Sequence, residues 1–328
     1  MAPIIDIHTH MFGNGWLGML KKHGGPVYDT KVLSDDRDYL FEHGAPACAL
    51  EVGAFDYDAR IKDMDTNKID VSIVSLTSPN VFWGGEDVSA ETARVTNDEM
   101  AEGQRAYPDR IRWLASIPWE YPEKALAELD RSVANGAVGG MVTGHINDKH
   151  LIDPLFEPIW AEIDRRGLPV LLHPTAPFGS KEAQFTSERI LMPGLGFMFD
   201  TTLAVGRMAV DGFFDRYTNL KIIVSHGGGY LPYVAGRLDV FLGVETLIPR
   251  KIKENPSEIL SNLYYDAILY DPGALDLCLD LAGPGNIMFG TDYPMPYDID
   301  KLYSIIDRLP GDQRDAIKGG KARKMFDL

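Results

Sequence analysis

The sequence predicts a distorted (β/α)₈ barrel formed by residues 1–328 as a single domain. Eight short runs rich in apolar and β-branched residues alternate with segments of helical periodicity, and several runs are continuously apolar. Such runs are typical of strands buried on both faces of a parallel sheet. The alternative is an open doubly wound sheet, which usually has a glycine-rich turn after its first strand. Here that turn holds His-Thr-His, so we expect the barrel.

Each strand is expected where an apolar run ends in polar, Gly or Pro residues. The predicted strands are, in chain order, Pro3–Ile7, Val71–Ser75, Ile111–Ser116, Val138–Thr143, Pro169–Leu172, Leu220–Ser225, Leu263–Asp266 and Ile287–Gly290. Helical periodicity between them predicts helices at Asp58–Asn67, Ser89–Ala106, Glu123–Asn135, Pro154–Arg166, Thr201–Asp211, Tyr230–Val240 and Pro272–Leu281. Two stretches rich in Pro and Gly, Gly13–Ala47 and Pro174–Leu195, are expected as long loops over the barrel mouth, the first as an insertion.

Composition narrows the class of protein. Of 328 residues 45% are hydrophobic, and 32 basic against 48 acidic residues give a formal charge of −16. An acidic surface repels phosphate backbones, so we expect no nucleic-acid partner. No run of eighteen apolar residues and no basic leader is present, so neither a membrane span nor a signal peptide is expected. Two distant cysteines, Cys48 and Cys278, fit a reducing cytoplasm.

Two histidines follow the first predicted strand. Residues two apart in an extended chain point the same way, so His8 and His10 can reach one ion at the carboxyl end of the barrel. A lone His-x-His is weak support for a metal site, and both rings could instead be hydrogen-bonded core residues. Their place at the end of a first barrel strand strengthens the metal interpretation.

Three further residues close later strands at the same end of the sheet. His173 ends the fifth strand, and His226 ends the sixth, before three glycines that leave room for a ligand. Asp292 follows the eighth strand, where Pro294 argues against a simple helix cap. The alternatives are a satisfied core histidine, an incidental loop histidine and an N-cap, respectively.

These residues together predict a metal site. Three His and one Asp form a typical set for Zn²⁺ with one open position, although Mn²⁺ or another divalent ion is possible. The predicted ligands are His8, His10, His173 and Asp292. His226 is then an acid or base acting on water or substrate, although spacing alone leaves open whether it ligates. His145 follows the fourth strand and is expected to line the pocket.

Several motifs resemble those of a known family. They are Ile5-Asp6-Ile7-His8-Thr9-His10, Leu172-His173-Pro174, Ser225-His226-Gly227-Gly228-Gly229, Asp266-Ala267 and Phe289-Gly290-Thr291-Asp292-Tyr293-Pro294. The chain is similar to the amidohydrolase-related metal-dependent decarboxylases, especially the branch that acts on aminocarboxymuconate semialdehyde. The resemblance implies one Zn²⁺ on His8, His10, His173 and Asp292, and a proton-shuttling role for His226.

The resemblance also implies a substrate contact from a partner subunit. Arg237 matches an arginine that binds substrate carboxylate across a homodimer, whereas a surface ion pair with Asp239 is the alternative. At Cys48 the chain departs from the branch, which has a second substrate-binding arginine there. One anion contact is therefore missing, which favours a less carboxylated substrate, such as a hydroxybenzoate-like acid.

We therefore expect a cytoplasmic enzyme that removes CO₂ without oxidation from an unsaturated or aromatic carboxylic acid. Trp83, Phe178 and Phe199 are candidates for a planar apolar wall, although core packing would explain each of them. The main alternative is a hydrolase or hydratase that uses metal-activated water on the same scaffold. A non-catalytic metal-binding protein is a further alternative, but it would not require the additional His226.

Overall fold

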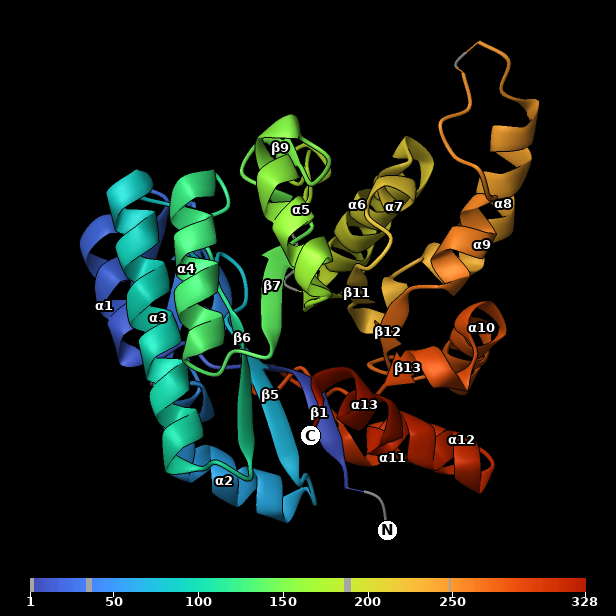
Figure 1. Cartoon of the computed structure of the whole chain (residues 1–328). Helices are drawn as coiled ribbons and strands as arrows, with labels where there is room; N and C mark the ends of the chain where they lie inside the picture. The colour runs from blue at the N-terminus through green and yellow to red at the C-terminus, as the bar shows by residue number, and fades with distance from the viewer. Residues whose placement is uncertain (1–2, 34–36, 186–189, 248) are drawn as a thin grey trace.

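The protein is described by a computed structural model that covers residues 3–33, 37–185, 190–247 and 249–328. Eight parallel strands form one sheet whose spatial order follows the chain (Figure 1). They are β1 (Ile5–His10), β5 (Val71–Ser75), β6 (Ile111–Ala115), β7 (Gly139–Thr143), β10 (Pro169–His173), β11 (Lys221–Val224), β12 (Tyr264–Asp266) and β13 (Ile287–Met288). Each predicted strand is present, which confirms the barrel architecture.

The last strand meets the first through irregular backbone. The Ile7 N–H donates to the Phe289 carbonyl at 3.0 Å, and the His10 N–H donates to the Tyr293 carbonyl at 2.6 Å. Thr9 also forms an isolated parallel bridge with Tyr293. The barrel is therefore nearly closed, and the segment after β13 lies directly beside the end of β1.

Helices cover the outside of the strands, and both termini lie near the start of β1 (Figure 1). The helices are α2 (Tyr57–Thr66), α3 (Glu86–Ala106), α4 (Pro122–Ala134), α5 (Glu157–Arg166), α6 (Phe197–Asp211), α7 (Phe213–Arg216), α8 (Leu231–Val244), α9 (Pro256–Ser261), α10 (Pro272–Ala282), α11 (Ile299–Asp307), α12 (Gly311–Asp315) and α13 (Lys321–Phe326). All seven predicted helices are present. The start predicted for α6 was wrong, because the helix begins at Phe197 and continues directly from a turn over Met192–Gly196.

The predicted insertion has secondary structure of its own. It contains α1 (Asn14–His23) and a three-stranded antiparallel sheet of β2 (Tyr28–Val32), β3 (Asp38–Glu42) and β4 (Ala45–Ala49). Interpreting this stretch as loop was wrong, because β2 is mostly exposed and polar and gives no apolar run. Residues 186–189 of the second predicted loop lie outside the described residues.

The barrel interior is a compact apolar layer. Its strand residues are Ile5, Ile7, Ile73, Leu114, Met141, Leu171, Ile223 and Met288. Ala322 and Phe326 of α13 pack against the same layer from the end where the strands begin. The interior is thus filled, which leaves the other end of the barrel for a site. No helix among the described residues has the length and apolar character needed to span a bilayer.

Candidate metal centre

A bulge in β1 directs two histidines into the barrel mouth. Ile5 and Ile7 face the interior, so simple alternation would turn His8 outward. The register with β5 instead advances three residues in β1 for two in β5 between Asp6 and Thr9. This extra residue resets the alternation, so Ile7 and His8 both face inward and His10 follows on the same side.

The other three residues come from the ends of β10, β11 and β13. His173 is the last residue of β10, whereas His226 and Asp292 adopt left-handed backbone with φ of 53° and 64°. His and Asp tolerate this region better than most side chains, and it turns both residues back over the mouth. After His226, a Cβ at Gly227 would lie 2.4 Å from a Leu269 methyl, so only glycine fits there.

These residues converge on one point. Asp292 Oδ1 lies 2.9 Å from His10 Nε2, 3.3 Å from His8 Nε2 and 3.9 Å from His173 Nε2. Asp292 Oδ2 lies 3.4 Å from His226 Nε2, and the Nε2 atoms of His8 and His10 are 3.2 Å apart. The ligand atoms of these five side chains can thus reach one shared ion. Four of them, from His8, His173, His226 and Asp292, lie within 4.8 Å of one another.

The donor set fits a divalent cation. Atoms bound about 2.0–2.2 Å from one ion must lie roughly 3–4 Å apart. The Asp292 oxygens lie 2.9–3.9 Å from the four histidine Nε2 atoms. Burial lowers the pKa of His10 to about 4 and that of His173 to about 3, which leaves both rings neutral with free lone pairs. The pKa of Asp292 is well below its usual value, because its hydrogen bonds with four histidines outweigh burial. A divalent-metal site therefore lies at the carboxyl end of the barrel.

Asp266, at the end of β12, fixes the tautomer of His8. Its Oδ2 accepts from His8 Nδ1 at 2.6 Å and from the His226 N–H at 2.9 Å. Its Oδ1 accepts from the N–H groups of Gly227 and Ile268 at 3.0 and 3.1 Å. Burial lowers the pKa of His8, but its hydrogen bonds with Asp266 and Asp292 prevail and raise the pKa to about 10, so a cation that binds Nε2 would displace a proton from it. Sequence reasoning gave Asp266 no role, although its position at a strand end was a usable signal.

Arg60 supports the same site from α2. Its guanidinium donates to Thr9 Oγ1 at 2.8 Å and to the His10 carbonyl, and it lies 4.7 Å over the ring of Tyr293. Arg60 is fully buried, so this cation joins β1 to the segment that carries Asp292. A single arginine in a helical segment gave no sequence signal of this role.

A cavity of about 640 Å³ lies between the insertion and the barrel mouth. The insertion contributes His23 and His43, and the mouth contributes Trp83, His145 and Thr175, two residues beyond His173. Trp83 and His145, two of the predicted substrate contacts, are among the residues that line this cavity. No Lys or Arg is among the described residues that line this cavity.

Both ring nitrogens of His145 have hydrogen-bond partners. Nδ1 lies 2.8 Å from the Asn147 carbonyl and Nε2 lies 2.9 Å from the Ala176 carbonyl. Phe178 stacks on the ring at 4.1 Å, and the buried Asp200 lies 3.7 Å from Nε2. His145 therefore joins the loops after β7 and β10, and Phe178 packs behind it.

The remaining two predicted contacts lie away from this cavity within one chain. Phe199 is 42% exposed on α6, and Arg237 is exposed on α8 with its guanidinium 4.6 Å from the Phe241 ring. The ion pair of Arg237 with Asp239 does not form, because Asp239 accepts instead from the N–H and hydroxyl of Ser257. Cys48, on β4, is half-buried and unpaired.

The sequence profile described as amidohydrolase matches residues 5–328. The chain belongs to the amidohydrolase family. The chain is 28% identical to 2-amino-3-carboxymuconate-6-semialdehyde decarboxylase of Dictyostelium discoideum, over 99% of this chain and 91% of that protein. It is 31% identical to the gamma-resorcylate decarboxylase of a Polaromonas species, over 83% of this chain and 87% of that protein.

A solved structure from the same genus extends the likeness to the whole amidohydrolase barrel. The dihydroxybenzoic acid decarboxylase of Polaromonas, with bound manganese and the inhibitor 2-nitroresorcinol, superposes with a TM-score of 0.83 at 27% identity. The match covers 100% of this chain and 98% of that structure.

Proposed function

We propose that this amidohydrolase is a metal-dependent, non-oxidative decarboxylase of an unsaturated or aromatic carboxylic acid. The observation that carries the proposal is the convergence of four histidines and Asp292 at the barrel mouth, where the segments after β7 and β10 also line a cavity. The similarity to enzymes named as decarboxylases of aromatic and muconate acids supports this reaction over hydrolysis.

His8, His10, His173 and Asp292 would hold the ion, and Zn²⁺ is the metal we propose. The manganese in the Polaromonas structure makes Mn²⁺ the principal alternative. When bound, a divalent cation acts as a Lewis acid toward the negative oxygens of a substrate. Asp266 would keep the His8 proton on Nδ1, so that Nε2 presents its lone pair.

His226 is the proposed proton donor. Its Nε2 points to Asp292, whereas its Nδ1 is buried without a hydrogen-bond partner among the described residues. A protonated His226 would deliver its proton to the carbon that bears the carboxylate, which interrupts conjugation there. The bond from this carbon to the carboxylate then breaks, its electron pair restores conjugation, and CO₂ leaves. Water returns a proton to His226, so the net change is one proton taken up for one CO₂ released.

The cavity supports a flat, lightly charged substrate. About 640 Å³ is ample for one aromatic ring with its substituents, and Trp83 offers an apolar wall. Phe178 would contribute to the cavity wall indirectly, by holding in place the His145 ring on which it stacks. Because Cys48 stands at the missing arginine position and the described cavity wall holds no Arg or Lys, we propose a hydroxybenzoate-like acid.

Arg237 would reach a substrate only in a homodimer. The outer face of α8 exposes large apolar side chains, with Tyr233 80% exposed and Val240, Phe241 and Val244 more than half exposed. Such a patch on a water-facing helix is typical of a protein interface. Arg237 lies within it, so we propose that it binds the carboxylate of a substrate in the partner subunit, with Phe199 near the same interface.

Product analysis tests the proposed reaction. Metal-loaded protein is incubated with 2,6-dihydroxybenzoate and related acids in ¹⁸O-labelled water, in parallel with His226→Gln. The proposal predicts CO₂ release and a product with one hydrogen in place of the carboxylate. Incorporation of ¹⁸O into the organic product without CO₂ would support the hydrolase or hydratase alternative instead.

We also propose a cytoplasmic location, supported by the two unpaired cysteines, Cys48 and Cys278.

A further inference from the structure

The insertion places the carboxylate of Glu42 in the wall of the cavity over the barrel mouth. Glu42 is the last residue of β3 and pairs with Tyr28 of β2, so both side chains lie on one face of the small sheet. Both residues line the cavity of about 640 Å³. The Tyr28 hydroxyl donates to Glu42 Oε1 only at 3.5 Å, which is a long and weak hydrogen bond.

The second carboxylate oxygen of Glu42 is open to a ligand. Oε2 forms no hydrogen bond or ion pair with the described residues, and it is not one of their solvent-inaccessible unpaired atoms. Glu42 is half-buried, so a molecule in the cavity can reach this oxygen. Burial raises the pKa of Glu42, because the carboxylate is partly desolvated there. A hydrogen-bond donor in the cavity would therefore be favoured at this position.

The other carboxylate of the cavity wall already has partners. Glu120 Oε2 accepts from Asn147 Nδ2 at 2.6 Å, and Glu120 Oε1 lies 3.8 Å from the Lys149 ammonium group. Of the two carboxylates among the described lining residues, Glu42 is thus the one that lacks a close donor.

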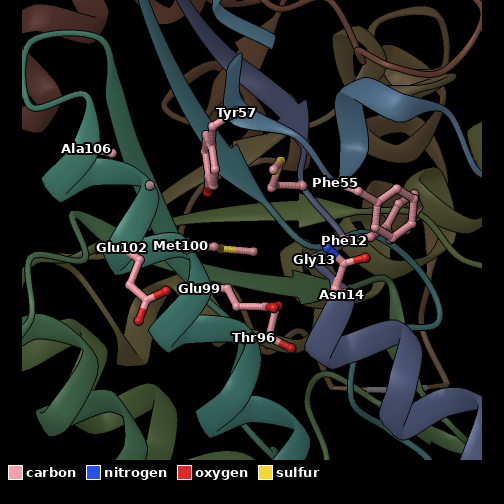
Figure 2. A pocket seen from close by; sticks show the side chains of 12 residues that line it. Phe12, Gly13, Asn14, Phe55, Tyr57, Thr96, Glu99, Met100, Glu102 and Ala106 are labelled. Carbon is pink, nitrogen blue, oxygen red and sulfur yellow. The ribbon is translucent and has the colours of Figure 1, made fainter. Parts of the chain in front are cut away.

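A buried carboxylate elsewhere in the chain shows the contrast. A cavity of about 250 Å³ lies between α1, α2 and α3, and Glu99 is among its lining residues (Figure 2). Glu99 Oε1 accepts from the Gly15 N–H at 2.8 Å, and its Oε2 is sealed from solvent. Glu99 therefore stabilises the start of α1 and is closed to a ligand, whereas Glu42 is accessible.

We propose that Glu42 is a specificity-determining residue that binds a hydroxyl or amino group at the end of the substrate remote from the reacting carboxylate. The cavity extends from the insertion to Thr175, two residues beyond His173. A substrate with its reacting carboxylate toward the metal centre would thus direct its other end toward Glu42. This inference rests on the proposed function, which supplies that orientation.

The chemistry of a desolvated carboxylate sets the preference. A hydroxyl or amino group would donate to a charged acceptor, which is a strong type of hydrogen bond. An analogue without the donor would displace water and leave the carboxylate unpaired, and a second carboxylate would be repelled. The preferred substrate is therefore an aromatic acid with a donor substituent, and aromatic diacids are disfavoured.

Calorimetric titration with matched acids tests the proposal. The full-length metal-loaded His226→Gln variant, which should bind the acids without consuming them, is titrated at pH 8 with 4- and 5-aminosalicylate and with 4- and 5-methylsalicylate. Amino and methyl groups have nearly the same size, but only the amino group donates. We expect at least one amino acid to bind at least tenfold more tightly than its methyl counterpart. Equal or tighter binding of the methyl acids at both positions would overturn the proposal.

Variants in the same His226→Gln background locate the effect. Glu42→Met removes both oxygens at a similar side-chain length and should abolish the preference for the amino group. Glu42→Gln keeps one acceptor but removes the charge, so 2-hydroxyterephthalate should bind several-fold more tightly than before. Asp29→Asn, at a 64% exposed position next to Tyr28, removes the same charge and should change neither result. If Glu42→Met keeps the preference, or Asp29→Asn loses it as well, Glu42 does not determine specificity.

CO₂ release by the wild-type protein separates this inference from the proposed function. CO₂ release with equal kcat/KM for the amino and methyl acids would retain the decarboxylase and contradict the role of Glu42. A tenfold binding preference that depends on Glu42, without CO₂ from any of the acids, would support that role and contradict the decarboxylase.

Discussion

Replacing Asp266 with Asn removes one charge and one acceptor from the centre of the hydrogen-bond network behind the metal site. The carboxylate accepts from four buried donors, two at each oxygen, at 2.6–3.1 Å. An amide offers one oxygen and one NH₂ group. One orientation places the NH₂ against His8 Nδ1–H and the His226 N–H, and the other places it against the N–H groups of Gly227 and Ile268.

Either orientation leaves two buried donors without an acceptor. At about 1–3 kcal/mol for each unpaired group, Asp266→Asn should cost roughly 2–6 kcal/mol in the free energy of unfolding. His8 can recover one bond by moving its proton to Nε2, but that proton then occupies the lone pair that faces the ion. We therefore expect metal affinity to fall about 10–100-fold in addition.

Competition with a chelating indicator measures the metal affinity, and calorimetric melting measures the stability. Asp6→Asn is the matched control, because Asp6 is equally buried on β1. One Asp6 oxygen accepts from the N–H groups of Thr291 and His8 at 3.1 and 3.3 Å, and Asn keeps this acceptor. The other oxygen accepts from the Thr291 hydroxyl at 2.7 Å, which can rotate and accept from an NH₂ group instead. The reasoning is refuted if Asp266→Asn retains the wild-type metal affinity and melting temperature, or if both variants lose them equally.

The other predictions concern single residues of the site and of its surroundings. His173→Ala should lose most of its metal by elemental analysis, and full retention would remove His173 from the ligand set. His226→Gln should keep its metal but turn over about 10²–10⁴-fold more slowly; an unchanged kcat would exclude it as the proton donor. Burial raises the pKa of Asp200 to about 6, so the folded protein binds its proton more tightly than the unfolded chain does. Its contribution to stability should thus fall by roughly 2 kcal/mol from pH 4 to pH 6, and Asp200→Asn should lack this slope in urea melts; equal slopes would contradict the assignment. Phe241→Asp should give a monomer by light scattering, whereas an unchanged mass would place any dimer contact elsewhere.

Much of the barrel could be predicted from the sequence because parallel strands leave a strong local signal. Runs such as Val170-Leu171-Leu172, just before His173, are apolar on both faces, and each marks one strand and its direction. Since all parallel strands end at the same side of the sheet, His173, His226 and Asp292 could be expected at one rim without knowledge of the contacts.

The features that the sequence did not predict arise from tertiary structure. The bulge in β1 adds one residue against β5, and nothing in Ile7-His8-Thr9 shows that extra residue. The roles of Asp266 and Arg60 depend on neighbours fifty or more residues away in the chain and on burial of a charge, which local patterns do not encode. Of the strands of the insertion, Tyr28–Val32 is mostly exposed and lacks an apolar face, although Asp38–Glu42, with which it pairs, buries Tyr39, Leu40 and Phe41.

The central claim is that His8, His10, His173 and Asp292 hold a single divalent ion. A crystal structure of the protein loaded with Mn²⁺ or Zn²⁺, with anomalous diffraction data, tests it most directly. We predict one strong anomalous peak about 2.0–2.3 Å from the Nε2 atoms of these histidines and from a carboxylate oxygen of Asp292. Stoichiometric metal bound at another site, with no peak among these four side chains, would contradict the account.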